Sequence, residues 1–153
     1  ARAQLARAEA GAGAPTDPRA LAARRAALAR EEARAARVVV RDLASGREEE
    51  WPAPGLAKLA LAFAGRGPTL VLAAEEGDTA RADLYALERG RPPRRLTDGP
   101  GRKTDPVAVP GGRWILYEAG PGRIGLLDLE GRASRVLEGA MPAVSADGST
   151  TVG

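Results

Sequence analysis

Two hydrophobic patterns meet near residue 38 and divide the chain. Before that point, residues 18–37 are rich in alanine and arginine, and the alanines recur at helical spacing, which predicts an α-helix. After it, β-branched residues appear, and short apolar runs alternate with Gly, Pro and Asp turns about every 8–12 residues. The chain is therefore predicted to be mainly β, with an N-terminal helical segment or insertion that spans residues 1–37.

Two residues predict where the helix begins. Asp17 offers a capping side chain, and Pro18 suits the first helical position because its missing N–H would be unpaired there anyway. One helix face carries mainly small side chains and can bury little area: Ala22, Ala26, Ala29, Ala33 and Ala36, flanked by Leu21 and Leu28. We expect this helix to dock weakly, or closely against a flat surface.

Three ten-residue windows in the β part resemble one another. They cover residues 63–72, 108–117 and 144–153. Each window reads as an apolar strand end, a tight turn and the start of a second strand. The turns close on Gly67, Gly112 and Gly148, which lie 45 and 36 residues apart. We predict a positive φ at these positions, because glycine adopts it without a Cβ clash.

A second element recurs between these hairpins. It reads as an apolar strand, an acidic residue and a glycine turn, and it covers residues 38–46, 84–90 and 124–131. Its acidic residues, Asp42, Glu88 and Asp128, align with offsets of 46 and 40 residues, and we interpret them as turn or strand-edge residues. A polar outer strand is predicted after each copy, at residues 47–51, 93–96 and 134–137.

Two elements that recur in the same order, about every 40–45 residues and with four strands per unit, are typical of β-propeller blades. We assign a partial blade to residues 38–51, complete blades to 57–96 and 105–137, and a partial blade to 142–153. Propellers close with about four to eight blades. We therefore expect the chain to be an excerpt of a longer protein, or the remaining blades to come from another chain.

Part of the repeat carries a family resemblance. Residues 83–87 (Asp-Leu-Tyr-Ala-Leu), 94–101 (Arg-Arg-Leu-Thr-Asp-Gly-Pro-Gly) and 105–117 resemble the repeat of TolB-like, WD-repeat-related β-propellers. The resemblance extends over about residues 38–153, and departs from the usual turn at residues 65–66 and at Gly111. It implies a bacterial protein of the periplasm or cell envelope, with the cytoplasm as the alternative.

Composition removes several classes of chemistry. The chain has no Cys and no His, which excludes disulfides, thiolate nucleophiles, Ser-His-Asp triads and histidine zinc sites. Residues 1–37 carry a net charge of +4 and the rest −1, so the basic character belongs to the helical segment. Its arginines lack interleaved aromatic residues for stacking on bases, which disfavours nucleic acid as a partner. No apolar run reaches the roughly 20 residues of a membrane span.

Two glycine motifs have ordinary explanations. Residues 120–125 spell Gly-x-Gly-x-x-Gly, but a strand is expected after them where a dinucleotide site needs a helix. Residues 99–104 resemble half of a phosphate-binding loop, yet no glycine precedes Lys103 and no helix is expected to follow. We predict a turn at the first motif and a loop between blades at the second, with no cofactor at either.

The acidic clusters and the large aromatic residues are also interpreted as structural features. Glu48 to Glu50, and Glu75 and Glu76 with Asp78, lack the spacing of calcium ligands and are interpreted as solvated faces. Three aromatic residues are expected to pack between blades: Trp51, Trp114 and Tyr117. No catalytic, cofactor-binding or metal-ligating residue is predicted in this chain.

Two functions follow from the resemblance. The first is a non-enzymatic scaffold that binds a protein or peptide. The second is the substrate-gating propeller of a larger prolyl-oligopeptidase-type serine peptidase, whose catalytic domain would lie outside this chain and be marked by a Gly-x-Ser-x-Gly motif. A sensor domain of a membrane protein is a third, weaker option. The apolar faces at the ends of an open blade stack predict self-association.

Overall fold

The computed structural model describes residues 17–64, 67–130, 134–139, 142–145, 147 and 151–152. The chain divides into two compact units, Ala1–Glu32 and Ala33–Gly153. In the described residues, one helix precedes several antiparallel sheets, none of which closes on itself. The prediction of a mainly β chain with an N-terminal helix is confirmed.

The helix α2 (Pro18–Ala35) begins at the predicted residue. The backbone N–H of Arg19 donates to the Asp17 carboxylate at 3.0 Å, and the N–H of Leu21 donates to the Asp17 carbonyl at 3.1 Å. Asp17 is therefore the N-cap. No residue of α2 is buried, which agrees with its alanine-rich face. Residues 1–16 of the predicted helical segment lie outside the described residues.

Every sheet joins its strands in chain order, so each connection is a hairpin. The first sheet has two strands, the next two have four strands each, and the last has two. The first sheet consists of β1 (Val39–Arg41) and β2 (Glu48–Glu50). The first four-stranded sheet consists of β3 (Leu56–Ala64), β4 (Thr69–Glu76), β5 (Ala82–Glu88) and β6 (Arg94–Arg95), and the second of β7 (Thr104–Ala108), β8 (Trp114–Glu118), β9 (Arg123–Asp128) and β10 (Ser134–Glu138). The last sheet consists of β11 (Ala143–Val144) and β12 (Thr151–Val152).

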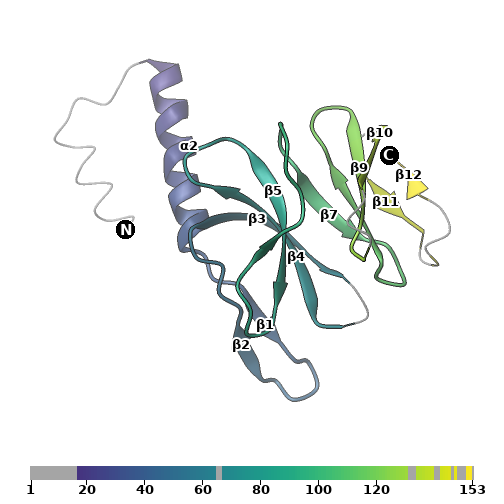
Figure 1. The fold of residues 1–153 in the computed structure, drawn as a ribbon. Coiled ribbons are helices and arrows are strands. Elements are labelled where there is room, and N and C mark those ends of the chain that lie inside the picture. The colour runs from purple at the N-terminus through teal and green to yellow at the C-terminus, as the bar shows by residue number, and fades with distance from the viewer. Residues whose placement is uncertain are drawn as a thin grey trace. The chain divides into compact units, whose positions relative to one another are not determined.

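The sheets bury side chains against one another. Successive side chains of a strand point to opposite faces, and both faces of β4 and β5 are buried. Leu72 packs on one face with Val38 and Trp51 from the β1–β2 hairpin, whereas Leu84 on the other face packs with Ile115 of the second four-stranded sheet. Figure 1 shows these two larger sheets side by side, the first in teal and the second in green.

A third cluster lies on the far face of the second four-stranded sheet. Leu116 and Ile124 are buried there, with Val144 of β11 packed against them. Apolar clusters therefore lie between each pair of consecutive sheets. The three aromatic residues belong to these clusters: Trp51 to the first, Tyr117 to the second and Trp114, half-buried, to the third.

The predicted turn glycines differ in conformation. Gly112 has a φ of 74°, as predicted, and its N–H donates to the Val109 carbonyl at 3.0 Å. Pro110 and Gly111, with a φ of 93°, occupy the centre of this turn, which is the pairing that a type II turn requires.

The prediction of a positive φ is wrong at Gly67. There the N–H of Thr69 donates to the Gly67 carbonyl at 2.8 Å, so Pro68 is the central residue of a three-residue turn. The proline ring holds φ near −65°, and the chain reverses without a left-handed residue at Gly67. Gly148 and residues 65–66 lie outside the described residues.

Candidate functional site

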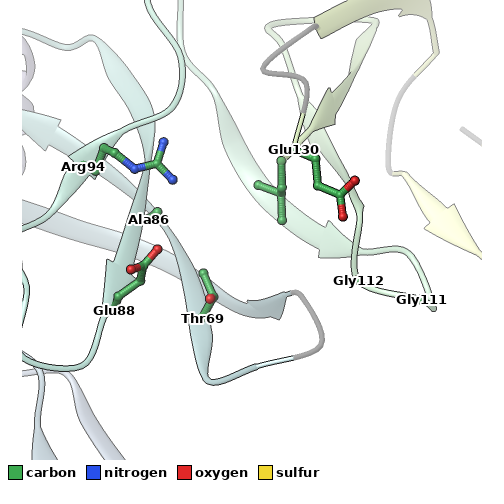
Figure 2. A pocket seen from close by; sticks show the side chains of 8 residues that line it. Thr69, Ala86, Glu88, Arg94, Gly111, Gly112 and Glu130 are labelled. Atoms are coloured by element: carbon green, nitrogen blue, oxygen red, sulfur yellow. The ribbon is translucent and has the colours of Figure 1, made fainter.

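A hollow opens between the two four-stranded sheets, with a volume of about 230 Å³ (Figure 2). Residues from both sheets and from the turn between β7 and β8 line it: Thr69, Ala86, Glu88, Arg94, Gly111, Gly112, Leu129 and Glu130. A second hollow of about 530 Å³ shares Ala86, Glu88 and Arg94 with it and continues along residues 91–95. We call the two together the inter-sheet groove.

The groove carries charges of both signs. Glu88 and Glu130 lie on opposite sheets, and Arg94 lies beside Glu88 on the neighbouring strand (Figure 2). The Glu88 carboxylate accepts a hydrogen bond from Arg91 at 2.7 Å, and Glu130 forms a longer ion pair with Arg113 at 3.8 Å. Within the described part of the chain, Arg94 has no ion pair. Its guanidinium is therefore available to a ligand.

A buried carboxylate supports the strand that carries Arg94. Asp83 is 2% exposed, and it pairs with Arg95 of β6 and with Lys103 at 3.2 Å. The Thr97 hydroxyl donates to the same carboxylate at 3.1 Å and accepts the N–H of Leu84 at 2.9 Å. Asp83 thereby ties β5 to β6 and to the loop that leads to β7. We call Asp83, Arg95, Thr97 and Lys103 the Asp83 cluster.

Two opposing effects determine the pKa of Asp83. Burial raises it, but hydrogen bonds from Arg95 and Lys103, together with the charges of those two side chains, outweigh burial and hold the pKa below its usual value. The carboxylate is therefore ionised at neutral pH. Its oxygens interact with the side chains of Arg95, Lys103 and Thr97, so the role of this carboxylate is structural.

Lys103 is engaged inside the loop that resembles half of a phosphate-binding motif. Its ammonium donates to the carbonyls of Gly99 at 2.8 Å and Pro100 at 3.1 Å, and it pairs with Asp83. An ammonium has three donors, and these partners use all of them. The other glycine motif leads directly into β9, a strand, as the sequence indicates.

The acidic clusters behave differently from one another. Glu75 is 4% exposed and pairs with Arg102 at 2.5 Å, so the prediction of a solvated face is wrong for this residue. It fails because both faces of β4 are covered as far as Glu75, whereas Glu76 at the end of the strand is exposed. The β2 carboxylates remain on the surface, where Arg37, Arg41 and Arg89 pair with them. No group of side chains in the described ranges could hold a metal ion.

The three aligned acidic residues have three different roles. Asp42 accepts hydrogen bonds from the N–H and hydroxyl of Ser45 and shapes the turn after β1. The Asp128 carboxylate, 4% exposed, accepts hydrogen bonds from two guanidinium nitrogens of Arg113 at 2.7 and 3.1 Å. The same guanidinium lies over the Trp114 ring, 5.1 Å from the ring centre. Glu88 ends β5 and faces the groove. Residues at equivalent positions of the repeat therefore do not form one common binding site.

Sequence reasoning did not identify the groove. Glu88, Arg94 and the glycines of the β7–β8 turn are predicted only as structural parts of the repeat. Arg94 and Glu130 are 36 residues apart in the chain, and no motif connects them. A comparison of the sequence with protein-family models and with curated proteins finds no match. None of the described residues forms a helix with the length and apolar character of a membrane span.

Proposed function

We propose that this chain is part of a β-propeller that serves as a protein-interaction scaffold without catalysis of its own. Four-stranded antiparallel sheets that follow one another in chain order, with an apolar cluster between each consecutive pair, support the propeller architecture. The resemblance of the repeat to TolB-like propellers supports a bacterial cell-envelope location.

The inter-sheet groove is the proposed binding site for a peptide segment. The observation that carries this proposal is the guanidinium of Arg94, which has no ion pair among the described residues and lines the groove on the same side as Glu88, with Glu130 on the opposite side. A guanidinium without a partner binds a carboxylate strongly and directionally. Gly111 and Gly112 line the groove without side chains, so a peptide backbone can approach closely there. The fitting ligand is an extended segment with an acidic residue flanked by basic ones.

Selection from a random peptide library on the immobilised chain tests this proposal. We expect enrichment of peptides with an acidic residue beside basic residues. Arg94→Glu should weaken the selected peptides about 10- to 100-fold, as expected for the loss of a charged hydrogen bond worth about 1.5–3 kcal/mol. Isothermal titration calorimetry with the best peptide measures the change.

Arg47→Glu is the matched control. Arg47 is also exposed, but it lies in the turn before β2, away from the groove. This variant should bind the selected peptides like the parent chain. If both charge reversals weakened peptide binding equally, net charge would drive the binding, and the groove would not be the binding site.

A further inference from the structure

Further hollows continue from the inter-sheet groove along β6, the outer strand of the first four-stranded sheet. A hollow of about 320 Å³ lies beside residues 95–98. A smaller hollow of about 80 Å³ shares Arg94 with the inter-sheet groove and Arg95 with the hollow just described. The hollows therefore follow one another along the whole of β6 and past its end.

One edge of β6 has open backbone groups. β6 is the last strand of its sheet, so among the described residues only its β5 side pairs with another strand. The N–H of Leu96 donates to the carbonyl of Leu84 on β5 at 2.7 Å. Residues of an antiparallel strand alternate between groups that face the partner and groups that face away. The N–H groups of Arg95 and Thr97 therefore point away from β5, and so do the carbonyls of Pro93 and Arg95.

Local features restrict what can pair with this edge. The Thr97 carbonyl already accepts a hydrogen bond from the Arg95 side chain at 2.8 Å, and Pro92 and Pro93 precede the strand. Short edge strands that carry charges and prolines resist pairing with apolar strands. A strand with an acidic side chain is different, because its carboxylate can pair with the Arg94 guanidinium across the two strands. The edge therefore selects its partner by charge.

The side chains on the groove face of β6 indicate which ligand residues would fit. Leu84 belongs to the apolar cluster between the two four-stranded sheets, and Leu96 packs against that cluster. Arg94 lies two residues before Leu96, so both side chains are on the face that looks toward the second four-stranded sheet. A strand laid beside β6 would fit best with an acidic side chain opposite Arg94 and an apolar one opposite Leu96. One residue would separate the two.

We propose that the peptide binds as an additional antiparallel strand on β6, with an apolar residue opposite Leu96 and, two positions later, an acidic residue opposite Arg94. This inference rests on the proposed binding function and specifies how the peptide is recognised. The apolar residue comes first because antiparallel strands run in opposite directions. The residue between the two exchanges two hydrogen bonds with Arg95: its N–H donates to the Arg95 carbonyl, and its carbonyl accepts from the Arg95 N–H.

The selected peptides and their N-methylated forms test the pairing. The selected peptides should carry an apolar residue two positions before the acidic one, and absence of this spacing would contradict the proposed register. A methyl group on the backbone nitrogen of the intervening residue removes a hydrogen bond and places bulk against β6, so the dissociation constant should rise at least about 10-fold.

N-methylation of the acidic residue is the matched control, because its N–H would point away from β6. Calorimetry should show a change in the dissociation constant of less than about twofold, since no hydrogen bond to the chain is lost. Equal effects of the two methyl groups would overturn the strand pairing.

Amide hydrogen exchange followed by NMR tests the pairing on the 153-residue chain. With saturating peptide, the Arg95 N–H should exchange at least about 10-fold more slowly than in the free chain, because it becomes hydrogen-bonded. The Leu96 N–H is the internal control, since it is bonded to Leu84 with or without peptide. Unchanged exchange at Arg95 would overturn the pairing.

The failure of this inference is distinguishable from the failure of the proposed function. If Arg94→Glu weakens peptide binding while the Arg95 N–H stays unprotected, the groove remains the binding site and only the strand pairing is wrong. If the library yields no binding peptide, both proposals are wrong.

Discussion

Replacing Asp83 by asparagine is expected to lower the free energy of unfolding by about 3–5 kcal/mol, the usual cost of breaking a buried ion pair from one side. The substitution preserves the shape of the side chain and removes only its charge. Lys103, 7% exposed, would then hold its ammonium inside the protein without a counterion, and Arg95 would lose its carboxylate partner. Urea unfolding followed by tryptophan fluorescence measures the change.

Asp98→Asn is the control for this prediction. Asp98 lies one residue after Thr97 but is exposed. Its substitution should change the free energy of unfolding by less than about 0.5 kcal/mol, as surface substitutions usually do. An Asp83→Asn variant as stable as the control would show that the Asp83 cluster does not hold β6 and the following loop in place.

A second substitution should recover much of the loss. In the Asp83→Asn background, Lys103→Met removes the uncompensated ammonium while retaining a long apolar side chain. Buried ion pairs can be replaced by apolar residues at little cost. The double variant is therefore expected to be more stable than Asp83→Asn alone, and the double-mutant cycle gives the interaction energy of the pair.

Acid should weaken the same interaction. Because the pKa of Asp83 is lowered in the folded chain, its contribution to stability is fully present above the unfolded-state value of about 3.9. The contribution is lost as the pH falls through the folded-state pKa. The stability difference between the parent chain and Asp83→Asn should therefore be constant near neutral pH and shrink below about pH 3.9.

Gly125→Ala is expected to destabilise the second four-stranded sheet by about 1–3 kcal/mol, the usual cost of overpacking a core. Gly125 of β9 pairs directly with Tyr117 of β8, and the tyrosine ring lies over the glycine. A Cβ at position 125 would come within 2.0 Å of the Tyr117 Cζ. The ring would have to leave the cluster between the two larger sheets, where it is 3% exposed.

Gly67→Ala provides the matched control. A Cβ there meets nothing within 4 Å, and φ is not positive. Alanine restricts the unfolded chain more than glycine does, so this variant should be unchanged or more stable by about 0.4–1 kcal/mol. Thermal unfolding followed by circular dichroism compares the two. Equal stability of both alanine variants would mean that the ring does not need the space above Gly125.

Features encoded by neighbouring residues were predictable. The helix begins at Pro18 because Asp17 caps it, and the turn at Gly112 has the conformation that its Pro-Gly pair favours. The alternation of short apolar runs with turns indicated antiparallel strands. Even among these features Gly67 was mispredicted, because Pro68 reverses the chain in another way. Such features depend on hydrogen bonds and steric limits within a few residues.

By itself, then, the amino-acid sequence determined the helix start, the β character and the turn at Gly112, because short-range backbone preferences and side-chain periodicity act locally. Only the tertiary structure decided which charges are buried and which are free. Glu75 and Asp83 are buried because neighbouring sheets and loops cover them, while Arg94 lines the groove with no ion pair among the described residues. Those outcomes depend on distances between strands far apart in the chain, and no local pattern encodes such distances.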